Sequence, residues 1–228
     1  MGEGHPAARI PGTDRFINMG HLHPRGAGMG GVNTPEDLVV LDLNLKKISG
    51  KYEHMNEAMI HAAIFKARPD VGAVIYSHPR YCNAFASLAM PIPSYGEGIP
   101  IWDSDGAIVD ERRGSGLVKA LGQSNAILLR NPHSLVVCAA DVKDAMALVY
   151  YIEVKARKDY LSLMLGKIMG GDNFSFKPEH YGKQMETDPR IEYEHLLISV
   201  DDFGIEVEHS DLWRFLHEKN IAPGLTTK

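Results

Sequence analysis

Residues 71–88 read VGAVIYSHPRYCNAFASL. The apolar run at residues 71–76 predicts a buried β-strand, and Pro79 prevents the strand from continuing before a helical pattern begins at about Tyr81. His78 is therefore expected at the carboxyl end of the strand, where α/β enzymes tend to hold ligands and metals. Simple packing, or capping of the following helix, is the alternative account of a lone histidine in this place.

The bulk composition is that of a globular protein. The chain has 228 residues, 44% of them hydrophobic, so we expect one domain over residues 1–228. A net charge of −5 without a Lys/Arg cluster disfavours nucleic acid or an anionic membrane as a partner. No apolar run approaches the roughly 20 residues of a membrane span and the start lacks a signal-peptide layout, so we expect a cytoplasmic protein. Cys82 and Cys138 fall in apolar patterns, which predicts two reduced core thiols.

The first 37 residues are rich in Gly, Pro and His and read as loops and hairpins. A compact domain rarely begins with so much irregular chain unless it serves a site. His5, His21 and His23 are therefore candidates for a site, and exposed turn residues are the alternative.

Periodicity and turn signals predict the other elements. Short strands are expected at residues 8–10, 16–18, 38–43, 99–102, 107–109 and 196–200, and helices at residues 116–121, 141–165 and 210–219. The segment NAILLRNPHSLVVCA predicts two apolar strands joined by residues 130–134. Asp141 is expected to cap the long helix, with Val142, Ala145, Met146, Val149, Ile152 and Ala156 on its apolar side.

A carboxylate and a second histidine accompany His78. Asn56 is expected to cap a helix, which puts Glu57 in the first helical turn, where the helix dipole alone can explain a carboxylate. His61, one turn later, is expected to be a satisfied helix histidine. His133 lies beside a proline at the second strand junction. Two histidines at strand ends and a carboxylate at a helix start are ligand types of a divalent metal site with open positions.

Together, several phrases of the sequence resemble the class II aldolase/adducin family over about residues 4–153. They are GHPAARIPGTDRF, HPRGAG, NTPEDLVVLDL, NEAMIHAAIFKARPDVGAVIYSHPRYCNAFA and LGQSNAILLRNPHSLVV. The resemblance implies an α/β fold, a single α/β/α domain with a central, largely antiparallel sheet, usually assembled as a homotetramer with sites between subunits. Because the chain starts at the family's glycine-rich segment, we expect the usual leading helix to be absent.

The resemblance also implies a ligand set. Family enzymes hold Zn, Mn or a similar divalent ion with an HxH pair, a distant histidine and often a glutamate. By position, His78 matches the second histidine of the pair, His133 the distant one, and Glu57 the carboxylate that binds metal or acts as acid/base. Tyr76 stands where the first histidine is expected, and its phenol, with a pKa of about 10, is a poor substitute. The RNPHS segment is one residue longer than the family's usual turn.

Three outcomes for this site stay open. The site keeps two histidines and Glu57, another histidine moves in, or the site is lost. The histidines that could move in are His21, His23 and His54.

The expected substrate is a non-phosphorylated carboxylic acid. The phosphate-binding places of sugar-phosphate members read here as residues 4–7, 23–26 and 55–56, where two hydroxyl donors are gone and a proline removes an amide. The GH..AR pattern resembles the family's decarboxylases of hydroxylated aromatic acids. We expect catalysis from Glu57, Tyr76 and Arg80, and substrate binding from His5, His23 and Arg25.

The leading hypothesis is a metal-dependent carbon–carbon lyase that decarboxylates a hydroxy-aromatic or keto acid, with Zn, Mn or Fe as cofactor. Two histidines and one carboxylate are also the ligand set of non-haem Fe(II) oxygenases, so an oxidative decarboxylase is a second hypothesis. A non-catalytic, adducin-like assembly module with a remnant of the site is the third.

Overall fold

The structure is a computed structural model that describes residues 4–21, 35–95, 98–131 and 133–168. The chain divides into two compact units, Met1–Pro178 and Glu179–Lys228, and every described residue belongs to the first. The expected strand at residues 196–200 and helix at residues 210–219 lie outside the described residues. One domain over the whole chain therefore stays a prediction.

The described residues form nine strands and four α-helices. The strands are β1 (Gly4–Arg9), β2 (Arg15–His21), β3 (Leu38–Asp42), β4 (Lys47–Ser49), β5 (Glu53–His54), β6 (Ala73–Ser77), β7 (Ile101–Asp103), β8 (Ala126–Asn131) and β9 (Ser134–Ala139). The helices are α1 (Ala58–Ala67), α2 (Arg80–Ser87), α3 (Glu111–Leu121) and α4 (Val142–Ile168). Two short 3₁₀ turns, Pro35–Asp37 and Pro93–Tyr95, complete the described structure.

One sheet runs through the centre in the order β4-β3-β2-β1-β6-β9-β8-β7, with β5 paired to β2. Every pairing in it is antiparallel except the parallel pair β7 and β8. The expectation of a central, largely antiparallel sheet is confirmed.

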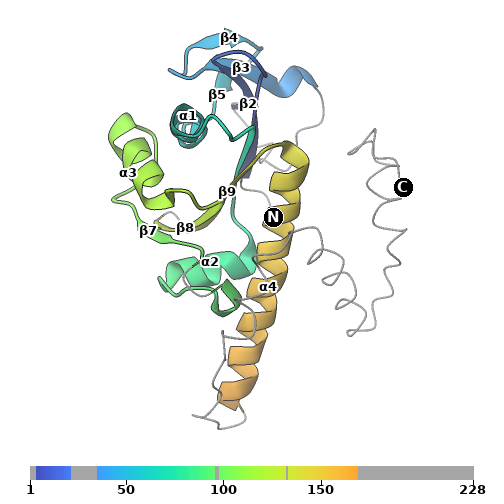
Figure 1. Cartoon of the computed structure of the whole chain (residues 1–228), viewed down its shortest axis with the longest axis vertical. Coiled ribbons are helices and arrows are strands. Elements are labelled where there is room, and N and C mark those ends of the chain that lie inside the picture. The colour runs from blue at the N-terminus through green and yellow to red at the C-terminus, as the bar shows by residue number, and fades with distance from the viewer. Residues whose placement is uncertain (1–3, 22–34, 96–97, 132, 169–228) are drawn as a thin grey trace, which may run out of the picture. The chain divides into compact units, whose positions relative to one another are not determined.

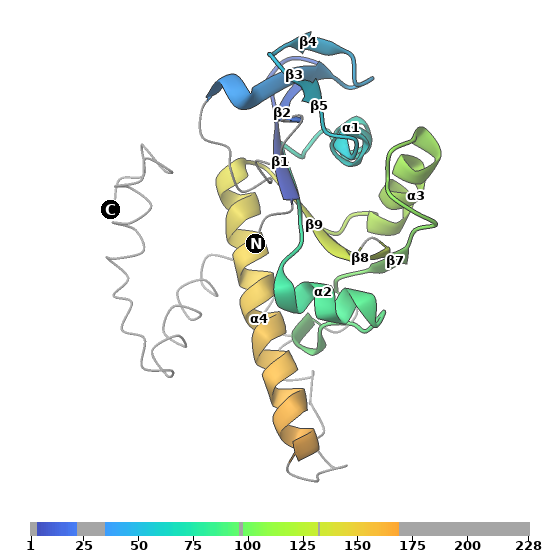
Figure 2. The same ribbon diagram turned by 180° about the vertical axis from the view of Figure 1, so that it is seen from behind.

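Helices cover both faces of this sheet, which makes the α/β/α arrangement (Figure 1). Alternate side chains of β6 point to opposite faces, as the pleat requires. Val74 and Tyr76 join the core beneath α1 and α3, whereas Ala73 and Ile75 join the core beneath α2 and α4. The view from behind shows the same separation of α1 and α3 from α4 (Figure 2). The apolar run at residues 71–76 is thus buried on both sides, as expected of a central strand.

Helix α4 fixes the start of α2, directly after His78. The first residue before α2 is Pro79, whose side chain cannot cap a helix. The Glu153 carboxylate of α4 instead accepts hydrogen bonds from the main-chain nitrogens of Tyr81, at 3.0 and 3.1 Å, and Cys82, at 3.0 Å. These nitrogens are among the unpaired donors of a helix start, so a half-buried carboxylate from another helix does the capping.

Four expectations about the helices and strands need correction. Helix α1 is preceded by Glu57 as its N-cap residue, not by Asn56. Helix α3 begins five residues earlier than expected, where the Asp110 side chain accepts from the Arg113 main-chain nitrogen. Residues 107–109 form no strand. On α4, capped by Asp141 as expected, the predicted apolar positions Val142 and Met146 are exposed.

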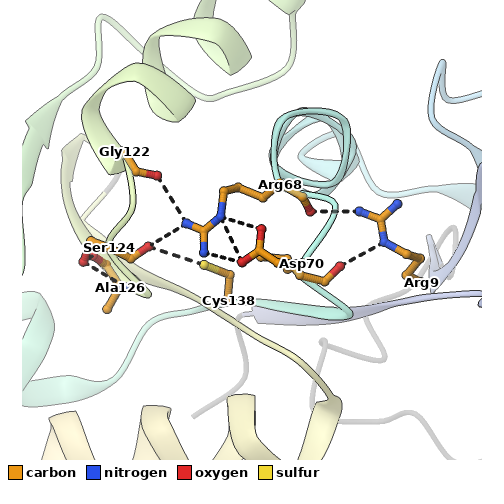
Figure 3. A network of polar contacts seen from close by, with 8 residues as sticks. Arg9, Arg68, Asp70, Gly122, Ser124, Ala126 and Cys138 are labelled. Carbon is orange, nitrogen blue, oxygen red and sulfur yellow. Dashed lines mark hydrogen bonds and ion pairs between the residues drawn. The ribbon is translucent and has the colours of Figure 1, made fainter.

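Two arginines fix the C-terminal end of α1 (Figure 3). Arg9 of β1 donates to the main-chain oxygens of Phe65 (2.7 Å), Arg68 (3.1 Å) and Val71 (2.9 Å). The Arg68 guanidinium pairs with Asp70 at 2.7 Å, raising the pKa of Arg68 and lowering that of Asp70. It also donates to the main-chain oxygens of Gly122 and Ser124, at 3.2 and 3.4 Å. The two arginines thus give donors to carbonyl oxygens at the ends of both α1 and α3.

Replacing Arg68 with alanine is expected to lower the free energy of unfolding by about 2 kcal/mol, because a largely buried guanidinium and its hydrogen bonds to Asp70, Gly122 and Ser124 are lost. Its side chain is only 10% exposed. Arg112 is the matched control, since it pairs with Asp105 at 2.5 Å but is 67% exposed. Arg112→Ala should change stability little, because exposed ion pairs contribute little. Urea denaturation measures both, and equal losses in the two variants would refute the argument from burial.

Both cysteines are free and buried, which confirms the expectation of core thiols. Burial raises the pKa of Cys138 to about 11, so this thiol is protonated at neutral pH. None of the helices in the described ranges is long and apolar enough to cross a membrane.

Candidate functional site

One edge of the sheet collects most of the predicted site residues. At the end of β6, Ser77 pairs with Gly4, the first residue of β1, and with Leu135, near the start of β9. His78 follows β6 and His133 precedes β9, so both lie at this edge. Antiparallel pairing thus brings together two histidines 55 residues apart in the sequence.

Helix α1 directs Glu57 toward the same edge. Two contacts fix the direction of α1 along β1: His61 contacts His5 near the start of the strand, and Phe65 contacts Arg9 at its end. Glu57 lies one turn before His61 and therefore beyond the His5 end of the strand. Its side chain is half-buried and makes no capping hydrogen bond.

A buried imidazole pair lies behind this edge. His5 Nδ1 is 2.6 Å from His61 Nε2, and both side chains are almost wholly buried. Burial lowers the pKa of His5 to about 4, with a further lowering by the charge of His78. Burial, and then the charge of His5, lower the pKa of His61 well below its usual value. At neutral pH both rings are uncharged, so one nitrogen of the contact donates and the other accepts.

The pair corrects two expectations. His5 is enclosed and bonded to His61, so it is not free to pair with a substrate carboxylate as expected. His61 is not a satisfied helix histidine, because its Nδ1 and the Nε2 of His5 have no hydrogen-bond partner among the described residues. Buried unsatisfied nitrogens are uncommon in proteins, which marks this pair as more than core packing.

Aromatic contacts continue from the pair to the edge. The ring of Tyr76 lies 5.2 Å from that of His5 and 4.9 Å from that of His78, centroid to centroid. Tyr76 is buried and faces the core under α1 and α3. The phenol therefore separates His5 from His78 instead of standing free in a cavity.

His78 is held in one orientation by the main chain. Its Nδ1 lies 2.8 Å from the carbonyl oxygen of His133. A carbonyl only accepts hydrogen bonds, so Nδ1 carries the ring proton and Nε2 keeps its lone pair. This tautomer is the one in which Nε2 of a neutral histidine binds a divalent ion.

The rest of the predicted ligand set does not assemble. Within the described ranges, no three His, Cys, Asp or Glu side chains lie close enough together to hold a metal ion. His133 is exposed, and its carbonyl is the group that faces His78. His78 fits a metal ligand, but His78, His133 and Glu57 as placed do not fit a three-ligand site.

The other residues predicted for the site do not lie together in one place. Arg80 is the first residue of α2, two positions after His78, and its exposed guanidinium has no ion pair within the described part of the chain. His23 and Arg25 lie outside the described residues. His21 and His54, the possible replacement ligands, line one cavity where β2 pairs with β5. Lys51, Tyr52, Glu53 and Asn56 complete the lining of that cavity.

Sequence comparison assigns the family. A model described as the Class II Aldolase and Adducin N-terminal domain matches residues 3–159. The match covers more than half of the chain, so the protein belongs to this family, and the resemblance seen in its motifs is confirmed. Enzymes of the class II aldolase type are lyases that use a divalent metal ion such as Zn.

Individual relatives agree with this assignment. The chain is 26% identical over 164 residues to 5-deoxy-D-ribulose 1-phosphate aldolase of Bacillus thuringiensis serovar kurstaki, covering 66% of this chain and 75% of that one. It is 32% identical over 133 residues to L-fuculose phosphate aldolase of Escherichia coli O6:H1, covering 54% and 60%. The solved L-fuculose 1-phosphate aldolase from Glaciozyma antarctica PI12 is 25% identical with a TM-score of 0.62, covering 81% and 72%. The match to the Escherichia coli enzyme thus spans less than two thirds of that protein.

Proposed function

We propose that the chain is a carbon–carbon lyase that decarboxylates a non-phosphorylated hydroxy-aromatic or keto acid. The observation that carries this choice is the burial of side chains that cannot bind phosphate. The structure describes two of the three places where the resemblance locates phosphate donors, residues 4–7 and 55–56. In them His5, Ala7 and Met55 are buried, and His5 is bonded to His61. A phosphate would find few exposed donors there.

In the proposed reaction the bond between the carboxylate carbon and its neighbour breaks, and carbon dioxide leaves. The electron pair stays on the substrate carbon, and Glu57 as the acid returns a proton to it. Arg80 supports the choice of an acid substrate, because its exposed guanidinium, two positions after His78 in the sequence, can pair with a carboxylate. A divalent ion (Zn, Mn or Fe) belongs to the proposal as cofactor. The proposed reaction steps do not involve this ion, because the three predicted ligands do not come together among the described residues.

A phosphosugar aldolase is the second candidate. It is supported by the three relatives named above, all of which are phosphosugar aldolases that share at least a quarter of the aligned residues. Lys51 lines a cavity together with His21 and His54, and the ammonium group of a lysine can bind a phosphate.

Product analysis separates the two candidates. Purified protein, supplied in turn with Zn²⁺, Mn²⁺, Co²⁺ and Fe²⁺, is offered hydroxy-aromatic acids, keto acids and ketose phosphates. The proposal predicts carbon dioxide from an acid and no aldehyde from the phosphosugars. Aldehyde release from a ketose phosphate alone would establish the second candidate instead, and oxygen consumption with Fe²⁺ would indicate the oxidative alternative.

A cytoplasmic homo-oligomer, with four subunits as expected from the resemblance, is part of the proposal. The self-association in this proposal is supported by the apolar side chains that α4 exposes, because apolar patches on a protein surface mark contact sites. They are Val142, Met146, Tyr150, Tyr160, Leu161, Leu163, Met164 and Leu165. Light scattering on the purified protein should give four times the chain mass, and a monomer mass would refute this part.

A further inference from the structure

The main-chain carbonyl oxygen of His133 accepts hydrogen bonds from two side chains. His78 Nδ1 lies 2.8 Å from this oxygen. The Asn83 amide nitrogen, in the orientation that satisfies the amide, lies 3.2 Å from the same oxygen and 3.2 Å from the carbonyl oxygen of Pro79. Two donors thus converge on the two lone pairs of one main-chain oxygen.

These contacts tie three pieces of chain together at the sheet edge. Asn83 belongs to α2, whose start is fixed by Glu153 of α4. His78 follows β6, and His133 lies in the turn before β9. The position of the carbonyl is therefore set by the helix layer as well as by the sheet, and the ring of His78 is oriented by a group that cannot rotate away on its own.

The imidazole of His133 takes no part in this arrangement. It is exposed, and it belongs to no group of three metal-binding side chains in the described ranges. The main-chain oxygen of His133 faces His78, so the residue already contacts the site through its backbone.

We propose that His133 works in the site through its main-chain carbonyl, as a positioning residue for His78, and that its imidazole is not a metal ligand. The carbonyl keeps the proton of His78 on Nδ1 and so leaves the lone pair on Nε2. The proposal replaces the ligand role expected for His133. It rests on the proposed function only for what His78 does there, and the tautomer itself can be measured without any reaction.

His133→Ala tests the proposal because alanine keeps the carbonyl and removes the ring. Nitrogen-15 spectra of the ring at mildly alkaline pH, with the His78 signals assigned by their loss in His78→Asn, should show the proton of His78 on Nδ1 in the wild type and in His133→Ala alike. Mn²⁺ affinity measured by calorimetry should stay within roughly threefold of the wild type, because loss of even an outer-shell partner typically costs tenfold or more. A change of tautomer in His133→Ala, or an affinity loss above tenfold, would overturn the proposal.

Two replacements of His78 make a matched pair. The amide nitrogen of asparagine takes the place of Nδ1 and can still donate to the His133 carbonyl, whereas that of glutamine takes the place of Nε2. His78→Asn should therefore keep a melting temperature closer to the wild type than His78→Gln, while both lose Mn²⁺ affinity. Equal melting temperatures would count against the carbonyl contact. If the wild type turns over no acid but keeps the Nδ1 tautomer, only the proposed function fails.

Discussion

Glu57→Gln is expected to lower the turnover of the proposed decarboxylation by about 10²–10⁴-fold, the usual contribution of a positioned acid or base. Glutamine has nearly the same shape but cannot deliver a proton. The Glu57 side chain makes no capping hydrogen bond to α1, so the replacement should leave the melting temperature nearly unchanged. Initial rates of carbon dioxide release, measured at saturating substrate, give the result.

Glu111→Gln is the matched control for this variant. Glu111 lies in the first turn of α3, and its side chain is 83% exposed. The Glu111→Gln variant should release carbon dioxide at the wild-type rate. If Glu57→Gln retained at least half of the wild-type turnover, the acid would have to be another residue and the role proposed for the start of α1 would be wrong.

Acidification should destabilise the fold between pH 6.5 and about 4, because of the His5–His61 pair. The pKa of each ring is lower in the folded chain than the ordinary 6.5, to about 4 for His5. Below pH 6.5 the unfolded chain therefore binds more protons than the folded chain, and stability falls as the pH falls. Each ring contributes up to about 1.4 kcal/mol per pH unit, and above pH 6.5 neither contributes. Lowered carboxyl pKa values, such as that of Asp70, act mainly at lower pH.

His61→Gln isolates this effect, because a glutamine amide can still bond to His5 but does not titrate. The slope of unfolding free energy against pH, taken from urea titrations between pH 6.5 and 4, should fall by about half. His133→Gln, at an exposed histidine, should leave the slope unchanged. A slope in His61→Gln equal to that of the wild type would show that the pair does not exclude protons in the folded state.

The elements that depend on local sequence alone were predictable. Strand β6, the break at Pro79 and helix α2 follow from local pattern alone. The hairpin of β8 and β9 appears where two apolar runs flank residues 130–134. Local chemistry also explains the Asp141 cap, whose side chain accepts from the Asp144 main-chain nitrogen at 2.8 Å.

Helix limits that depend on distant packing were not predictable. The beginning of α3 is polar and contains Gly114, which usually disfavours a helix. In the fold, an added Cβ at Gly114 would be 3.0 Å from Ala63 of α1, so the glycine permits the two helices to approach closely. This role of Gly114 becomes clear only when the position of α1 is known, so the sequence could not predict the start of α3.

The candidate site could be predicted only in part, for the same reason. His78 at a strand end follows from residues 71–88, but the contact between His5 and His61 joins residues 56 apart. One signal was available: His61 shares the buried side of α1 with Ile64 and Phe65, so a core position was readable from its spacing. Which group of His133 faces His78 depends on the geometry of one turn, which sequence spacing does not determine.

The proposed function requires that a divalent ion binds at the sheet edge through Nε2 of His78. Titration with paramagnetic Mn²⁺, followed on the ring signals of the 11 histidines, tests it most directly because Mn²⁺ broadens the signals nearest to it. We expect the His78 ring signal to broaden at the lowest Mn²⁺ concentrations, and His78→Asn to abolish the selective broadening of the other signals. Broadening that is strongest at histidines away from this edge, or that is unchanged in His78→Asn, would contradict it.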